Sequence, residues 1–467
     1  MEQVSDGSCL LCWLSGSFGF EDTTMIRITQ SRAVPQLVAL QKSLFNCRHK
    51  SHGATENHSC KLLIVGGGSA GCSIAAKFAS KLGRGKVVIL EPSDVHYYQP
   101  LFTLVGGGVS SVERTVRPMG SVLPKDATWV KDEAVSFTPE ENLVKTKNGS
   151  CIKYDMLVLA LGLQLNFNKV EGLLEALETP KSGVVSNYSP KYCSNTFQEL
   201  QAFSKGNAVF TCPSTPIKCG GAPQKAAYLS EHYMRKTGKR KDANIIYRTG
   251  AGVYFPSPHY EKVLYKVAAS RGIDVAIKED LIKVNPKQKT AIFENVDSKK
   301  QTTIEYSFLH ATPPQGPPSV LAKCKDLTDS AGWVNVNKET LQHVKYSNVF
   351  SLGDCSNLPT SKTGAAVAGQ LGILSKNLLS ALEGKPLQAK YSGYTSCPLV
   401  TGYGSLILAE FDYDKNPVET LPFDQRKESR INYELKKHVM PAIYWTLMLR
   451  GFWDGPGKLR SISNPLG

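Results

Sequence analysis

Residues 61–71, KLLIVGGGSAG, set the fold of this chain. Positions 61–65 are a short, mostly apolar run typical of a buried strand, and the six residues after them satisfy the pattern G-x-G-x-x-G. In that pattern Gly66 allows a tight turn, Gly68 lets a pyrophosphate approach the backbone, and Gly71 lets helix and strand pack closely. A strand that runs into this loop predicts a site for a nucleotide diphosphate.

The residues that follow complete the unit. Apolar positions in 74–82 recur at helical spacing, and residues 87–90 form a second apolar strand that leads to Glu91, 20 residues after Gly71. The helix would direct its N-terminus at the phosphates, and Glu91 would bind both hydroxyls of an adenosine ribose. The sequence therefore predicts a dinucleotide-binding Rossmann domain, since it places a strand, a glycine loop, a helix, a second strand and an acidic residue in the expected order and at the expected spacing.

Two later segments indicate which nucleotide this is. Residues 154–162, YDMLVLALG, and 348–354, NVFSLGD, each lead a strand into a glycine turn. Both resemble the second and third flavin motifs of the glutathione-reductase-like flavoproteins, which contain two dinucleotide-binding domains. The resemblance implies an α/β fold with two Rossmann-like domains and FAD as cofactor, with Asp354 on its ribityl chain. It also implies a helix over about 364–382 whose N-terminus faces the flavin N1/C2 region.

The second nucleotide domain lacks the expected glycine loop. A strand at 207–211 is followed by residues 212–223, CPSTPIKCGGAP, in which prolines remove backbone N–H donors that a pyrophosphate needs. A helix over about 224–235 and a strand at 244–247 still follow, so we expect the Rossmann-like fold without its NAD(P)H site. An NAD(P)H:quinone oxidoreductase of the same fold and a non-catalytic flavoprotein scaffold stay open as alternatives.

Five further segments make the resemblance specific. Residues 218–225, KCGGAPQK, and 394–403, YTSCPLVTGY, look like the two redox-cysteine segments of the mitochondrial sulfide:quinone oxidoreductase family. Residues 97–100, 353–363 and 448–451 are also similar to that family. The likeness extends over nearly the whole chain after its N-terminal part.

That resemblance implies a function and a set of site residues. It implies FAD-dependent oxidation of hydrogen sulfide, with electrons passed to ubiquinone and sulfane sulfur passed as a persulfide to a small acceptor of the glutathione, sulfite or coenzyme A class. It makes Cys219 and Cys397 the redox pair, with the persulfide on Cys397. In addition to the three loop glycines, the residues that it places at FAD are Ser69, Ala70, Glu91, Gln99, Ala134, Asp354 and Lys362.

The two cysteines are 178 positions apart, so only tertiary structure can bring them together. A disulfide needs Cα atoms about 5.5–6 Å apart, and a bridge that reacts must be accessible or strained. Attack of HS⁻ on one sulfur would leave a persulfide there and expel the other as a thiolate, whose pKa Lys218 or Lys225 could lower. The residues alone leave the order of the cysteines open, and two buried free thiols are the plain alternative.

Composition agrees with a folded enzyme. The chain has 467 residues, of which 41% are hydrophobic and 20% charged, and 55 Lys and Arg against 40 Asp and Glu give a net charge of +15. These values exclude wholesale disorder and collagen-like or coiled-coil architectures. The basic residues form no stripe interleaved with aromatics, so we expect no nucleic-acid partner. The scattered histidines and cysteines predict no metal site.

The N-terminal region predicts a cellular address. Residues 25–55 contain bases and no acid, spaced among apolar residues, which is typical of a mitochondrial presequence, whereas the acidic residues 1–24 do not fit an import signal. We therefore predict import into mitochondria, and the family resemblance implies the matrix side of the inner membrane. The predicted segments are 1–55 as extension and targeting segment, 56–170 and 321–390 as the two parts of the FAD domain, 171–320 as the second Rossmann-like domain, and 391–467 as the redox-cysteine and membrane segment.

The C-terminal region carries an apolar run at 439–449, bounded by His438 and Arg450. Its 11 residues are too few to span a bilayer, which takes about 20. With bases around it, including Lys436 and Lys437, the run fits a peripheral anchor whose bases face anionic lipid. Such an anchor would let ubiquinone reach the flavin from the membrane. The candidates for the lining of that path are Phe411, Tyr413 and Tyr444. A buried core helix is the alternative.

Overall fold

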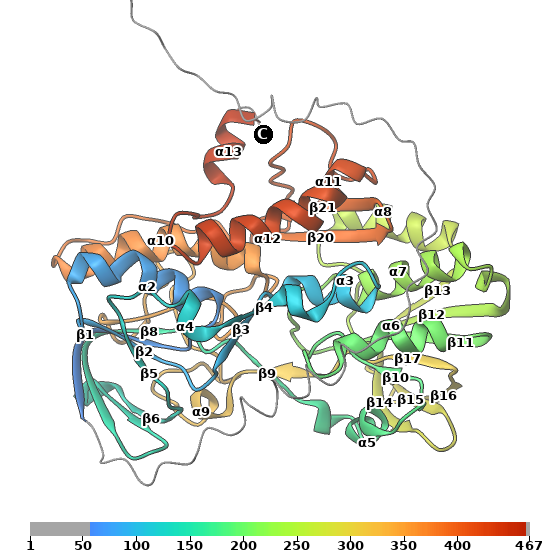
Figure 1. The fold of residues 1–467 in the computed structure, drawn as a ribbon, viewed down its shortest axis with the longest axis horizontal. Helices are drawn as coiled ribbons and strands as arrows, with labels where there is room; N and C mark the ends of the chain where they lie inside the picture. The colour runs from blue at the N-terminus through green and yellow to red at the C-terminus, as the bar shows by residue number, and fades with distance from the viewer. Residues whose placement is uncertain (1–56, 464–467) are drawn as a thin grey trace, which may run out of the picture. The chain divides into compact units, whose positions relative to one another are not determined.

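The computed structural model describes residues 57–463 (Figure 1). The targeting segment predicted within residues 1–55 lies outside them. Residues 55–467 belong to one compact unit, so the domain boundaries predicted inside it stay predictions. This unit is built around two mainly parallel sheets. The glycine motif at 66–71 predicts the first sheet, and the strand at 207–211 without such a motif predicts the second.

The first sheet has the strand order β5-β2-β1-β8-β7-β6, with β19 also paired to β8. Strands β5, β2, β1, β8 and β19 run parallel, whereas β7 pairs antiparallel with both β8 and β6. The strands are β1 (His58–Val65), β2 (Val87–Leu90), β5 (Thr128–Val130), β6 (Ala134–Thr138), β7 (Leu143–Thr146), β8 (Cys151–Leu159) and β19 (Val349–Ser351). Because β1 and β19 are parallel, the first and third flavin motifs leave the sheet at the same edge.

Helices α2 (Ser69–Leu82) and α10 (Gly364–Leu382) follow these two motifs and pack against each other (Figure 1). Among the described helices, α10 is long and apolar enough to cross a membrane by length and composition. It nevertheless buries Gln370, which accepts a hydrogen bond from the Gly353 amide at 2.8 Å, and Asn377, which bonds to the backbone of Ala389. These polar contacts make α10 a core helix.

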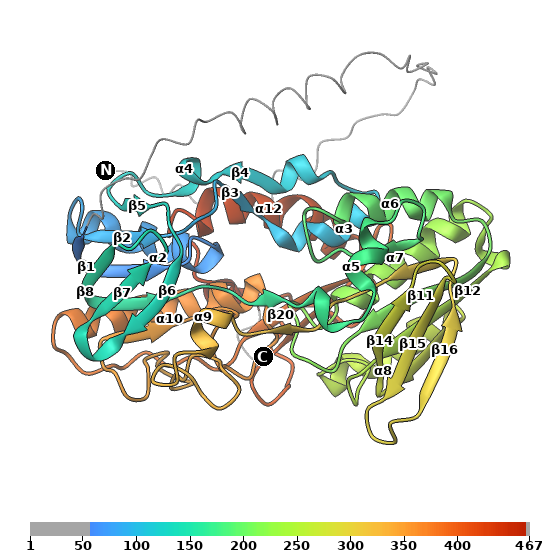
Figure 2. The same cartoon turned by 90° about the horizontal axis from the view of Figure 1, so that it is seen from below.

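The second sheet is entirely parallel, in the order β10-β17-β11-β12-β13. Its strands are β10 (Val184–Val185), β11 (Gly206–Cys212), β12 (Ala243–Thr249), β13 (Ile273–Ile277) and β17 (Phe308–His310). Its helices are α6 (Cys193–Ala202), α7 (Ala222–Lys236) and α8 (Pro258–Ser270). An antiparallel sheet of β14 (Glu279–Asn285), β15 (Thr290–Asn295) and β16 (Gln301–Glu305) lies beside β11 and β12 (Figure 2). The Rossmann-like fold thus persists where the glycine loop is missing.

Short elements connect the two sheets. The chain passes toward the second sheet through β9 (Gln164–Leu165, labelled in Figure 1) and returns through β18 (Gln315–Gly316), and these two strands pair antiparallel. Helix α3 (Phe102–Gly106), which follows β3 (Val95–Tyr97), packs on α6 and α7 of the second sheet. The carboxyl edge of the first sheet is therefore tied to the second sheet.

The C-terminal region adds a hairpin and a long helix. The hairpin consists of β20 (Thr395–Gly402) and β21 (Ser405–Phe411), and β20 packs on α7. Helix α11 (Arg430–Glu434), a π-helical turn (Leu435–Val439), α12 (Met440–Ile443) and a second π-helical turn (Tyr444–Met448) follow one another without a break, and we call residues 430–448 the C-terminal helix (Figure 1). Helix α13 (Gly457–Ser463) ends the described chain.

Candidate active site

The glycine loop between β1 and α2 forms a cradle for an anion. Gly66 has φ +104°, and a Cβ there would lie 2.5 Å from the Ala160 carbonyl oxygen, while a Cβ on Gly71 would collide with the Gly66 carbonyl oxygen. A Cβ on Gly68 would meet no other atom within 4 Å, so the space beside this residue is open. Helix α2 starts there with neither a side-chain cap nor an acid in its first turn, so its N–H groups remain available to phosphate oxygens.

Glu91 lies beside this cradle. Its carboxylate accepts hydrogen bonds from the Gly67 amide at 2.6 Å and from the Ser93 amide at 2.7 Å. Both bonds hold the carboxylate at the carboxyl edge of the first sheet, next to the loop, which is the position of the ribose-binding acid in a Rossmann domain. Cradle and acid together fit the adenosine diphosphate half of a dinucleotide.

The other predicted flavin residues gather around the same edge. A Cβ on Gly353 would lie 3.6 Å from the Ala70 Cβ, so the turn that carries Asp354 meets the start of α2. Lys362 donates hydrogen bonds to the carbonyl oxygens of Asp354 and Ser356, at 2.7 and 3.0 Å. These contacts bring the first and third motifs together, as their resemblance to flavin motifs implies.

The three remaining residues predicted at FAD are Gln99, Ser69 and Ala134, and the first two of them contact distant segments of the chain. The Gln99 side-chain oxygen accepts a hydrogen bond from Lys218 Nζ at 2.9 Å, which links the first sheet to the cysteine loop. The Ser69 and Tyr444 hydroxyls are 2.7 Å apart, which links the glycine loop to the C-terminal helix. Ala134 is buried at the start of β6, four residues after the end of β5.

The two cysteines meet as the resemblance implies. Their sulfur atoms are 4.0 Å apart, although Cys219 lies in the loop before α7 and Cys397 lies on β20. The packing of α7 on β20 brings them together. The Cys219 amide donates to the Lys362 carbonyl oxygen at 2.9 Å, and its φ of 53° is a left-handed conformation that non-glycine residues rarely adopt. The cysteine loop is therefore strained and fastened to the third flavin motif.

The surroundings of the two sulfurs differ. Lys225 Nζ lies 3.2 Å from the Cys219 sulfur. A hydrogen bond from the Cys397 thiol, the Lys225 ammonium and the Gly221 amide all stabilise the Cys219 thiolate, and they hold its pKa well below the ordinary value despite burial. The hydrogen bond with Cys219 and then burial raise the pKa of Cys397, which is 0% exposed. Cys219 is thus the thiolate of the reduced pair.

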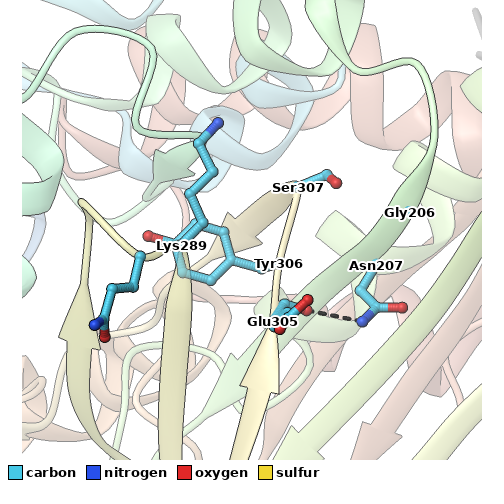
Figure 3. A pocket seen from close by; sticks show the side chains of 7 residues that line it. Gly206, Asn207, Lys289, Glu305, Tyr306 and Ser307 are labelled. Atoms are coloured by element: carbon cyan, nitrogen blue, oxygen red, sulfur yellow. Dashed lines mark hydrogen bonds between the residues drawn. The ribbon is translucent and has the colours of Figure 1, made fainter.

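The second sheet offers no cradle for a pyrophosphate at the position of the missing loop. A pocket of about 230 Å³ lies there, at the carboxyl ends of β11 and β12, and Pro213 and Pro216 form part of its wall together with Gly220. A second pocket, of about 320 Å³, lies at the opposite end of β11, beside Gly206 and Lys289 (Figure 3). None of the predicted site residues lines that second pocket.

Side chains that sequence reasoning placed elsewhere or missed also reach the site. His96 and the Tyr444 hydroxyl are hydrogen-bonded, and burial lowers the pKa of His96 to about 4, so the ring is neutral. The prediction that Lys436 faces lipid is wrong, because this side chain is buried and donates to the Pro100 carbonyl oxygen at 2.9 Å. Since Pro100 and Lys436 are 336 positions apart, no local signal reveals this contact.

Comparison with known proteins gives consistent matches. The family "Pyridine nucleotide-disulphide oxidoreductase" matches residues 60–192. The chain is 48% identical to "Sulfide:quinone oxidoreductase, mitochondrial" of Mus musculus, over 89% of this chain and 92% of the mouse protein. It is 47% identical to the protein of the same name from Dictyostelium discoideum, over 85% of this chain and 88% of that one. The solved sulfide:quinone oxidoreductase of Aquifex aeolicus shares the fold, with a TM-score of 0.72, 19% identity, and coverage of 87% of this chain and 96% of that chain.

Proposed function

This chain belongs to the mitochondrial sulfide:quinone oxidoreductase family, and we propose that Cys219 and Cys397 are the redox pair with which it oxidises sulfide and reduces a quinone. It is accordingly a mitochondrial flavoenzyme. The observation that carries the proposal is the 4.0 Å distance between two sulfurs that lie 178 positions apart, one of them beside a buried lysine.

The different surroundings of the two sulfurs indicate which sulfur HS⁻ attacks and which one leaves. HS⁻ attacks the Cys397 sulfur of the disulfide, the S–S bond breaks, and Cys219 leaves as a thiolate while Cys397 keeps the persulfide. This order is favoured because the thiol of lower pKa is the better leaving group, and Lys225 lowers the pKa of Cys219. A small thiolate or sulfite then takes the outer sulfur and leaves a Cys397 thiolate. Oxidation of the two thiolates restores the disulfide and releases two electrons.

The residues at the first sheet fit FAD as the group that receives these electrons. The α2 N-terminus and Gly68 would hold its pyrophosphate, Glu91 its adenosine ribose, and Asp354 its ribityl chain. When bound, the flavin would accept two electrons from the thiolates and pass them to the quinone. The strained loop around Cys219 is fastened to Lys362, which fixes where its thiolate faces the flavin-binding edge.

The outer face of the C-terminal helix supports attachment to a membrane. Ile431 is 66% exposed, Val439 and Leu447 are exposed, and Phe452 just beyond the helix is 79% exposed. A row of exposed apolar side chains with Lys437 and Arg450 nearby suits the lipid interface, where apolar groups enter and bases meet anionic headgroups. We place this face on the matrix side of the inner mitochondrial membrane, where ubiquinone is dissolved.

An anaerobic bleaching experiment tests the function. Sulfide should bleach the flavin absorbance of the purified protein, whereas NADH should not, because prolines occupy the place of a nicotinamide-nucleotide loop. Cys219→Ser should abolish bleaching by sulfide, and Cys324→Ser, which changes a half-buried thiol away from the site, should not. Bleaching by NADH, or full bleaching of Cys219→Ser by sulfide, contradicts the proposal. Turnover with glutathione, sulfite or coenzyme A then identifies the sulfur acceptor.

A further inference from the structure

The inner face of the C-terminal helix carries polar side chains that attachment to a membrane does not explain. Asn432 is 1% exposed and Lys436 is 2% exposed, and because they are four positions apart they lie on the same side of the helix. The outer face carries Ile431 and Val439. The inner face thus buries an amide and an amine among apolar side chains that include Tyr433, Tyr444 and Met448. A helix that packs only on an apolar core would bury no such polar groups.

Asn432 lacks protein partners for its side chain. Neither its Oδ1 nor its Nδ2 makes a hydrogen bond within the described residues, although both atoms are buried. Buried carboxamides are nearly always paired, because burial without a partner costs the full hydration of the group. An unpaired donor and an unpaired acceptor on one side chain point to a ligand that both accepts and donates hydrogen bonds.

Lys436 is poised next to that side chain. Its Nζ donates to the Pro100 carbonyl oxygen and lies 5.8 Å from the Tyr98 ring centre. Burial and then the Lys225 ammonium lower its pKa to about 7, while the Cys219 sulfur opposes this shift. On its own helix, Glu434 is paired to His438 at 3.4 Å on the exposed side. Lys436 can therefore give up a proton near neutral pH.

The contact with Pro100 places the Lys436 side chain near the predicted flavin edge. Pro100 also touches the first residue of α10, since its Cγ would lie 3.7 Å from a Cβ on Gly364. The flavin N1/C2 region is predicted at that helix N-terminus. Lys436 lies in a π-helical turn, a distortion that is frequent at functional sites.

We propose that Asn432 and Lys436 form the polar end of the quinone site and bind a head-group oxygen of a ubiquinone-class quinone. This inference rests on the proposed function. A quinone carbonyl accepts a hydrogen bond and a quinol hydroxyl donates one, so the Asn432 carboxamide can pair with either redox state. Reduction of a quinone takes two electrons and two protons. The electrons come from oxidation of the two cysteine thiolates, one proton comes from Lys436, and the other comes from solvent, which then reprotonates Lys436.

The outer face of the same helix explains why the head-group oxygen meets these two residues. Ile431 and Val439 flank Asn432 and Lys436 in sequence and face outward, so an isoprenoid tail in the lipid and a polar ring at the inner face would lie on opposite sides of one helix. The phosphates and the ribityl chain of the flavin would be bound by residues of the first sheet, so they do not need Asn432 and Lys436. A quinone would reach these two residues from the membrane, past the C-terminal helix.

The test separates the two half-reactions in the FAD-loaded enzyme. Lys436→Met and Asn432→Leu are mixed anaerobically with sulfide, and the reduced enzymes are then mixed with a short-chain ubiquinone analogue. Lys427→Met, an exposed lysine outside the helix, is the matched control. We expect flavin reduction by sulfide to slow much less than flavin reoxidation by the quinone, since the Lys436 charge also acts on Cys219 and Lys225. Flavin reoxidation should slow and the quinone KM should rise, together by roughly 10- to 100-fold, which is the loss of a hydrogen bond to a charged group. The pH dependence of reoxidation near 7 should vanish in Lys436→Met.

Thermal unfolding and flavin spectra exclude a merely structural role. Asn432→Leu should leave the Tm unchanged or raise it, because the substitution removes two unpaired polar atoms. Reoxidation and quinone KM equal to those of the wild type would overturn the proposal. A shifted flavin spectrum with unchanged quinone KM would also overturn it, since the two residues would then serve the flavin. Failure of sulfide to reduce the wild type would instead reject the proposed function.

Discussion

Replacement of Lys225 by methionine is the most direct test of the electrostatics of the cysteine pair. The substitution keeps the length and apolar stem of a side chain that is 3% exposed and removes the ammonium 3.2 Å from the Cys219 sulfur. At an effective dielectric constant of about 20, two unit charges at that distance attract by about 5 kcal/mol. The cost of removing both charges from water and of ordering the lysine side chain offsets most of this attraction. The net contribution of a hydrogen bond to a charged group is about 1.5–3 kcal/mol. The expected loss in thiolate-dependent rate is thus roughly 10- to 150-fold.

The assay follows the reduced enzyme. Alkylation of Cys219 is measured residue by residue by mass spectrometry over a range of pH, alongside the rate of flavin bleaching by sulfide. Because Lys225 lowers the pKa of Cys219, the thiolate in wild type persists to lower pH than in Lys225→Met. The loss should therefore be largest at acidic and neutral pH and shrink as pH rises and the variant ionises. Lys225→Arg should keep most of the rate.

Lys236→Met provides the matched control, since Lys236 is exposed at the far end of the same helix. The reasoning is refuted if Lys225→Met alkylates Cys219 at the wild-type rate at every pH. It is also refuted if Lys236→Met is as slow as Lys225→Met, because the effect would then come from the overall charge of α7.

Three other variants test the remaining parts of the site. Gly71→Ala should yield protein without flavin, measured by its absorbance after purification, because the new Cβ would collide with the Gly66 carbonyl oxygen. Tyr444→Phe removes the hydroxyl beside Ser69 and should release flavin at a lower temperature, by the loss of about 1 kcal/mol of hydrogen bonding, in a thermal-release assay. Ile431→Asp should weaken sedimentation with anionic lipid vesicles by roughly tenfold or more, since it removes about 1.5–3 kcal/mol of apolar burial, while activity with a water-soluble quinone should persist.

The local parts of the site could be predicted because their spacing carries the chemistry. Gly66, Gly68 and Gly71 mark the cradle at fixed intervals, and Glu91 follows at the end of the next strand. Lys225 is also a predicted neighbour of the thiolate, together with Lys218, since it lies six positions after Cys219 in the helix that follows the cysteine loop. In each of these cases the residues belong to one short, continuous segment of the fold, either a βαβ unit or a loop with the helix that follows it, so sequence distance translates into spatial distance.

The contacts between distant segments could not be predicted in the same way. Nothing in the spacing of Cys219 and Cys397 shows that α7 packs on β20, and only the family resemblance paired them. At the C-terminus the apolar run at 439–449 predicts a membrane anchor, but hydropathy does not distinguish a side chain that faces lipid from one that faces the protein interior. The buried Lys436 side chain has its hydrogen-bond partner, Pro100, in a short 3-10 turn at 99–101, 336 positions earlier in the chain.

The second Rossmann-like sheet shows how a fold can keep its binding place and change its ligand. In a parallel α/β sheet, ligands bind beyond the carboxyl ends of the strands, where the next helix directs its N-terminus. Here β11 ends at Cys212, α7 begins at Ala222, and the loop between them presents Cys219. The field that would stabilise a pyrophosphate stabilises the Cys219 thiolate, to whose sulfur the Gly221 amide donates. Because a thiolate needs the same positive potential as a phosphate but far less room, prolines can replace the glycines of the loop without cost to the reaction.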